Sequence, residues 1–197
     1  MDLTFQDSIG ALAFLIRAVA SGIYIVSILK GDTKPHLYTW LVFTLLTAIA
    51  FLAQIQDGGG MGIWTTGLAI LVSIINSLLA LSYGEKNITK SDKLALIAAT
   101  TSILPWLLTQ NPLGSVILVS LIDTIAMYPT FRKSWSKPQE ENLTSYFLVG
   151  LAFLLSTLAL THISVTTFLY PIAIAFINLS LIFLCLWRRH VLKSPKL

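Results

Sequence analysis

Long apolar runs occupy most of this chain and constrain its fold more than any other feature. A helix needs about 17 or more apolar residues to cross the hydrocarbon core of a bilayer, and seven runs of that kind occur here. Only 11% of the residues are charged, against about 25% in a typical soluble domain. We therefore predict an all-α integral membrane protein with seven transmembrane helices. The runs are residues 9–29, 38–55, 62–83, 93–109, 114–131, 144–161 and 166–187.

The breaks between these runs are short, and their basic residues alternate. If the N-terminus lies outside the membrane, every Lys and Arg except Arg17 falls at the inside. This is the positive-inside pattern, and it explains the net charge of +4 without a nucleic-acid surface. We expect a bacterial cytoplasmic membrane, with the N-terminus outside and the C-terminus cytoplasmic. The inside residues are Lys30, Lys34, Lys86, Lys90, Lys93, Arg132, Lys133, Lys137, Arg188, Arg189, Lys193 and Lys196.

Two parts of the chain repeat one pattern. The loops KGDTKP, starting at Lys30, and KSWSKP, starting at Lys133, each follow an apolar run that ends on the inside. In both parts a second run, an outer break and a third run follow, and the third run contains Asn76 or Asn178. The loops are 103 residues apart and the asparagines 102, which predicts two parallel three-helix repeats joined by one linker helix, a 3+1+3 plan. The predicted units are residues 1–84 and 112–190 for the repeats, 85–111 for the linker and 191–197 for a cytoplasmic tail.

Two charged residues interrupt equivalent runs of the repeats, Arg17 in FLIRAVA and Asp123 in SLIDTIA. A charge near the centre of a membrane helix costs about 2.5–3.5 kcal/mol on insertion scales. Counted from the matched loops, the two residues differ in depth by about 4.5 Å, so an ion pair across the bundle is geometrically reasonable. Three readings stay open: a static pair that fixes the packing, a coupling carboxylate or an anionic-substrate anchor, and two residues that never meet.

Asn76 and Asn178 each lie 12 residues from the outer start of their runs, at Trp64 and Thr166. That places both at about 18 Å depth, near the bilayer midplane. An asparagine there usually hydrogen-bonds a neighbouring helix, but its donor and acceptor can also contact a neutral polar solute. We expect both asparagines to contact substrate, and we assign the same role to Arg17 and Asp123.

Two prolines and one glutamine in the apolar runs also lead to structural predictions. Pro129 interrupts the hydrogen-bond ladder of its run and is the candidate hinge. Pro171 lies in the first turns of the last run, where proline is harmless, and Gln54 is expected to face water at the outer end of its run. The break DGGGMG lacks the lysine and the strand–helix context of a phosphate-binding loop, so we interpret it as a flexible outer loop.

The 3+1+3 plan resembles that of the SWEET/SemiSWEET and PQ-loop (MtN3-type) transporter superfamily. The stretch YPTFRKSWSKPQEENLTSYFL is similar to the family's helix-end pattern, with Pro129 and Thr130 where the family has Pro-Gln, whereas Val26 and Ser27 stand there in the first repeat. The resemblance implies a transporter that moves a sugar or other neutral metabolite by alternating access. It also implies that the asparagines of the third helices line the substrate pocket. The expected partners are a small solute and the lipid bilayer, and a homo-oligomer is left open.

Other classes of function fit the sequence less well. A receptor or scaffold of the same fold, which binds without translocating, is the alternative, although short loops offer a partner little surface. A retinal photoreceptor needs a lysine inside the bundle, and every lysine lies in an inside loop, the tail or the inner edge of a run. At membrane depth there is no Ser/His pair, paired carboxylate or metal-ligand spacing, so we expect neither an enzyme nor a cofactor or metal site.

Overall fold

The computed structural model describes residues 4–35, 37–84, 111–136 and 138–193, together with Lys90, Lys93, Leu94, Ile97 and Thr101. The regular secondary structure of these residues is all helical. The predicted linker helix, residues 85–111, lies almost wholly outside the described residues. The described helices are α1 (Phe5–Leu29), α2 (Leu37–Gln56), η1 (Gly60–Ile63), α3 (Trp64–Tyr83), α6 (Pro112–Ala126), α7 (Tyr128–Ser136), η2 (Pro138–Glu140), α8 (Leu143–Leu158) and α9 (Val165–Lys193).

Four of the described helical segments are long and apolar enough to cross a membrane: α1, α2, η1 with α3, and α9. The apolar helices α6 and α8 are shorter, with 15 and 16 residues, or about 22–24 Å of length each. The expectation of an all-helical protein with several apolar helices of spanning length is therefore confirmed. The count of seven spans and the linker between the repeats stay predictions.

Polar side chains set the starts of three helices. At α1, Thr4 Oγ1 accepts a hydrogen bond from the Asp7 amide at 3.2 Å, and Asp7 Oδ2 accepts one from the Thr4 amide at 3.0 Å, which is a capping box. Asn111 caps α6 through its side-chain oxygen, and Asn142 caps α8 in the same way. These caps begin each helix at the edge of its apolar run.

The run predicted as one helix over residues 114–131 is broken. Helix α6 ends at Ala126 and α7 begins at Tyr128, with Met127 between them. Pro129 follows two residues later and has no backbone N–H to donate to the carbonyl four residues earlier, so the ladder of α6 cannot pass through it. The break therefore lies beside the candidate hinge.

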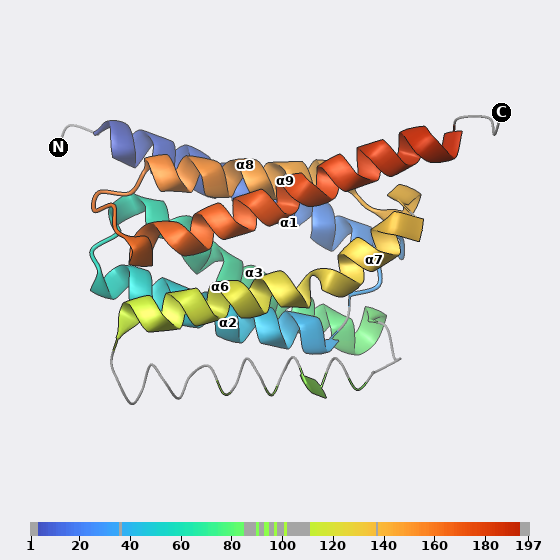
Figure 1. Cartoon of the computed structure of the whole chain (residues 1–197), viewed down its shortest axis with the longest axis horizontal. Coiled ribbons are helices and arrows are strands. Elements are labelled where there is room, and N and C mark those ends of the chain that lie inside the picture. Colours follow the sequence, from blue (N-terminus) through green and yellow to red (C-terminus); the bar gives the residue numbers. More distant parts are fainter. Residues whose placement is uncertain are drawn as a thin grey trace.

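The helices form two groups of three, which we call the first triplet (α1, α2, α3) and the second triplet (α6, α8, α9). In each, the third helix packs between the other two: α3 contacts α1 and α2, and α9 contacts α6 and α8. Between the triplets, α1 packs against α8 and α2 against α6, which closes a ring of six helices. Figure 1 shows that α1 and α6 both start at the end where the chain begins, with α3 and α9 parallel to them and α2 and α8 antiparallel.

This bundle exposes many large apolar side chains and buries many polar ones, unlike a typical soluble protein. Leucine and phenylalanine side chains such as Leu78, Phe176 and Phe183 are exposed on the outer surface. The buried side chains include many small and polar ones, among them Thr47 and Ser73. A surface of this kind suits contact with lipid, where apolar exposure has no cost and polar groups turn inward.

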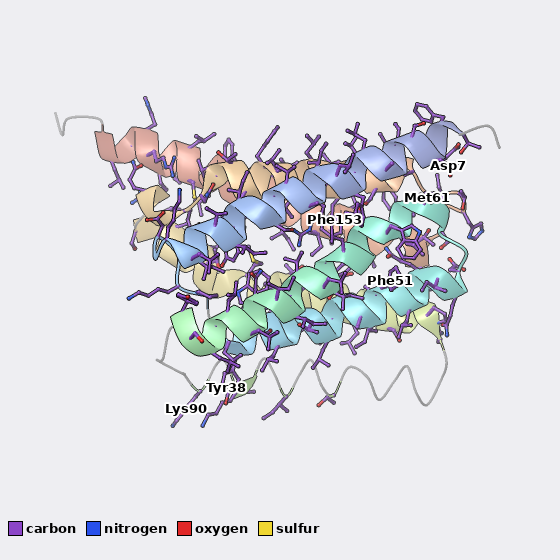
Figure 2. All side chains as sticks on the ribbon, turned by 180° about the vertical axis from the view of Figure 1, so that it is seen from behind. Asp7, Tyr38, Phe51, Met61, Lys90 and Phe153 are labelled. Atoms are coloured by element: carbon purple, nitrogen blue, oxygen red, sulfur yellow. The ribbon has the colours of Figure 1, made fainter. Side chains whose placement is uncertain are left out.

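The bundle has two distinct ends. The glycine-loop end, at which α1 begins, holds residues 57–63 and 159–164, and the basic end holds Lys30, Lys34, Arg188 and Arg189. In Figure 2, Asp7 and Met61 lie at the first end, whereas Tyr38 and Lys90 lie at the other. The apolar core between the ends is formed mainly by α2, α6, α8 and α9, and it includes Val42, Leu46, Ala50, Val116, Val119, Phe153 and Ile174.

Candidate functional site

Arg17 is buried in the middle of α1, with 8% of its surface exposed. Its Nη1 donates to Ser21 Oγ at 2.6 Å, and that hydroxyl donates in turn to the Arg17 carbonyl at 2.7 Å. The Nε atom is buried and has no hydrogen-bond partner. Arg17 and Ser21 share a helix face because they are four residues apart, but a neutral hydroxyl leaves the charge of the guanidinium uncompensated.

Asp123 does not supply the missing counter-charge. It is buried on α6 with 4% exposure, and among the described residues no acidic side chain lies within 4.0 Å of the Arg17 guanidinium. The expected direct ion pair between Arg17 and Asp123 is therefore not formed. Tyr170 of α9 is buried in the same bundle.

Tyr170 is held in place by its packing. Its side chain is 1% exposed, and its ring meets the Phe153 ring of α8 edge-on, with centroids 6.3 Å apart. The sequence analysis missed this residue because a tyrosine in an apolar run is indistinguishable from a packing residue. Its spacing was the available signal: Tyr170 and Asn178 are two turns apart, and both lie on the buried face of α9.

The two candidate asparagines are both buried, but they differ in their hydrogen bonding. Asn76 on α3 is completely buried, and neither its side-chain oxygen nor its nitrogen has a partner among the described residues. Asn178 on α9 donates through Nδ2 to the Ile174 carbonyl of its own helix at 2.8 Å. Since an unpaired buried amide is costly, Asn76 is the side chain more in need of a ligand or a water molecule.

Gln54 connects the triplets instead of facing water as expected. Its side chain is fully buried, and Nε2 donates to the Thr167 carbonyl of α9 at 3.1 Å. Within a regular helix that carbonyl would accept from the amide of residue 171, but Pro171 has no N–H to offer. Pro171 thus leaves the Thr167 carbonyl free to accept the hydrogen bond from Gln54. It was expected only to be harmless in the first turns of its helix.

The glycine-loop end is closed by hydrogen bonds between the triplets. The Gly62 amide donates to the Ala159 carbonyl at 3.2 Å, and the Thr161 hydroxyl donates to the Gly58 carbonyl at 3.1 Å. Ser164 Oγ donates to Asp57 Oδ2. The loop expected to be flexible is therefore held against the second triplet, and Gly58 adopts the positive φ of 70° that this turn requires.

The contacts described at the basic end lie mostly within each triplet. Tyr24 of α1 packs against Trp40 of α2 with ring centroids 5.3 Å apart, and Tyr146 of α8 donates a hydrogen bond to Glu141 at 3.1 Å. Between the triplets, Ser145 Oγ donates to the Ala20 carbonyl at 3.4 Å.

Two hollows open elsewhere on the molecule. One, of about 320 Å³, lies between α6, α7 and α9 and is lined by residues such as Phe131 and Phe176. The other, of about 440 Å³, lies where α1 meets Met61 and Trp64. Both are lined mainly by apolar side chains, and neither is lined by any candidate site residue. The four candidate residues are thus enclosed, with the apolar core packed beside them.

The candidate residues do not form a metal centre or a recognised motif. Among the described residues no group of three or more His, Cys, Asp and Glu side chains comes together. No protein-family model, curated protein or solved structure matches the chain. Among the described residues, the inside of the bundle holds the Arg17 guanidinium, the Asp123 carboxyl group, the Tyr170 phenol and the Asn76 amide, which has no hydrogen-bond partner there.

Proposed function

We propose that this protein is a membrane transporter that moves a small polar solute by alternating access. The proposal is supported chiefly by the arrangement of the two triplets. Each triplet has its third helix in the middle, and the two triplets run in the same direction. Buried polar groups without hydrogen-bond partners among the described residues lie inside the bundle. In this proposal the triplets are the two repeats of a 3+1+3 plan similar to that of the SWEET and PQ-loop transporters. The site lies near the midplane between them.

The proposal places the chain in a bacterial cytoplasmic membrane with its N-terminus outside. The glycine-loop end, which lacks lysine and arginine, is then the outer end, and the basic end is cytoplasmic. The hydrogen bonds between Asp57 and Ser164 and between Gly62 and Ala159 form the outer gate. The inner gate lies towards the basic end, where Ser145 of α8 donates to the Ala20 carbonyl of α1.

Within the site, Asn76, Asn178, Arg17 and Asp123 contact the solute. Asn76 offers a donor and an acceptor that nothing else uses. The break at Met127, followed by Pro129, lets α6 and α7 change their mutual angle when the basic end opens. The resemblance to SWEET transporters favours a sugar or another neutral metabolite as the solute.

The test is uptake by the purified chain in proteoliposomes. The vesicles are offered a mixture of sugars, amino acids and organic acids, and the accumulated solutes are identified by mass spectrometry. We expect accumulation of at least one solute by the wild type and its loss in Asn76→Ala and Asn178→Ala. Leu78→Ala, an exposed position two residues from Asn76, is the matched control and should transport normally.

Two outcomes would count against the proposal. If the wild type accumulates no solute above empty vesicles, the receptor or scaffold alternative takes its place. If both asparagine variants transport as the wild type does, the protein is a transporter but its site lies elsewhere.

A further inference from the structure

Arg17 is a buried cation whose surroundings provide no anion. Of the guanidinium N–H groups, only Nη1 is hydrogen-bonded, to the Ser21 hydroxyl, and the buried Nε has no partner. No carboxylate of the described residues lies within 4.0 Å. Burying an uncompensated charge costs several kcal/mol, in order-of-magnitude terms, so a side chain kept in this state at the centre of a membrane helix calls for an external partner.

The nearest neighbours of Arg17 on its own helix offer it no charge. One turn before and one turn after it on the buried face are Ala13 and Ala20, both completely buried. Neither side chain carries a hydrogen-bonding group. The one polar neighbour on this face, Ser21, already holds Nη1 and orients the group.

The second triplet supplies no anion to Arg17 among the described residues. Asp123 of α6 does not come within 4.0 Å of the guanidinium. Tyr170 of α9 is buried and packs against the Phe153 ring. A guanidinium fork beside hydroxyl groups is the pairing with which proteins hold a planar carboxylate.

We propose that Arg17, together with Ser21, binds the carboxylate group of a small organic acid between the two triplets. This inference rests on the proposed function for the transport step, but the binding itself does not depend on transport. It replaces the neutral solute implied by the resemblance with a solute that carries at least one negative charge. The carboxylate supplies the counter-charge that Arg17 lacks, and Asn76 contacts the uncharged remainder.

The test is ligand-dependent thermal unfolding of the purified full-length chain in detergent. Acetate, lactate and pyruvate are the carboxylate probes, chloride tests for a simple anion site, and glucose tests for a neutral solute. Because a ligand of the folded state raises its unfolding temperature, we expect at least one carboxylate to give a saturable rise of several degrees in the wild type. The rise should disappear in Arg17→Gln and persist in the matched control Arg188→Gln, whose arginine lies at the basic end over Trp135.

A second variant keeps the test informative if Arg17→Gln does not fold. Arg17→Lys retains the charge but lacks the planar fork, so we expect it to bind the same carboxylate about 10-fold more weakly. The proposal is overturned if none of the carboxylates shifts the wild type, if chloride shifts it equally, or if glucose alone does so. It is also overturned if Arg17→Gln responds to the carboxylates as the wild type does.

The same samples separate this inference from the proposed function. An Arg17-dependent carboxylate shift without any uptake in proteoliposomes would retain the binding site and reject transport. Uptake of a neutral sugar with no carboxylate shift would retain transport and reject the role of Arg17.

Discussion

The first and second triplets have the same helix order but differ in how their polar side chains are satisfied. In the first triplet, buried side-chain atoms of Arg17, Gln54, Thr65, Thr66 and Asn76 lack hydrogen-bond partners among the described residues, whereas in the second triplet Asn178 bonds to its own helix. The shared helix order therefore does not bring the same side-chain chemistry with it. In a site between such halves, most contacts to a solute would come from the first triplet.

The largest effect is expected where the triplets touch through backbone atoms. A Cβ atom added at Gly62 would lie 2.4 Å from the Ser156 carbonyl oxygen and 3.0 Å from the Leu160 amide nitrogen, two backbone atoms in the last turn of α8 and in the segment directly after it. Gly62→Ala should therefore destabilise the protein by about 2–4 kcal/mol through overpacking and loss of the bond to Ala159. Thermal unfolding in detergent measures this loss.

Gly22→Ala is the matched control for that prediction. Gly22 lies within α1, and a Cβ there would meet nothing within 4 Å. Alanine is the better helix former by about 0.5–1 kcal/mol, so this variant should be slightly more stable than the wild type. Equal effects of the two variants would show that the close contact at the glycine-loop end does not exist.

The next effect concerns the bond between Gln54 and Thr167. Gln54→Leu leaves the Thr167 carbonyl buried without its donor, at a cost of about 1–3 kcal/mol. Pro171→Ala supplies a backbone N–H that can take over this carbonyl, so the second mutation should cost less in the Gln54→Leu background than in the wild type. A double-mutant cycle from unfolding midpoints measures the coupling, and additive effects would contradict our account of Pro171.

The smallest effect separates the two asparagines. Asn76→Leu removes an amide whose donor and acceptor are both unpaired, and it should raise stability by about 1–2 kcal/mol. Asn178→Leu removes an amide that is already bonded to Ile174, so it should have no stabilising effect. The difference between the two unfolding midpoints is the readout, and a loss of stability in Asn76→Leu would mean that its amide is satisfied in the folded protein.

The sequence determined the helix-level features and left the contacts between helices open. Apolar run length predicted the ends of α1, α2, α3 and α9 to within six residues because membrane thickness imposes that length. It also predicted that Arg17, Asp123, Asn76 and Asn178 would be buried, since polar groups in membrane helices avoid lipid. Pro129 predicted an interruption of its run, and the structure has the break at Met127, two residues earlier.

The contacts across the triplets could not be predicted, because they depend on helix rotation and on which backbone atoms meet. Depth alone made an ion pair between Arg17 and Asp123 reasonable, but depth does not determine whether the two side chains face each other across the bundle. The sequence implied that the Thr167 carbonyl is left free by Pro171. Its hydrogen-bond partner, Gln54, is known only from the packing of α2 against α9.

The central claim is that the two triplets move relative to each other, opening one end as the other closes. Distances between spin labels test it directly in nanodiscs, with one pair at Gln56→Cys and Ile163→Cys and a second pair at Lys30→Cys and Ser136→Cys. These positions are exposed, whereas the single native cysteine, Cys185, is buried. The account predicts two distance populations for each pair, with conditions that lengthen one distance shortening the other. A single narrow distance for both pairs under all conditions would contradict alternating access.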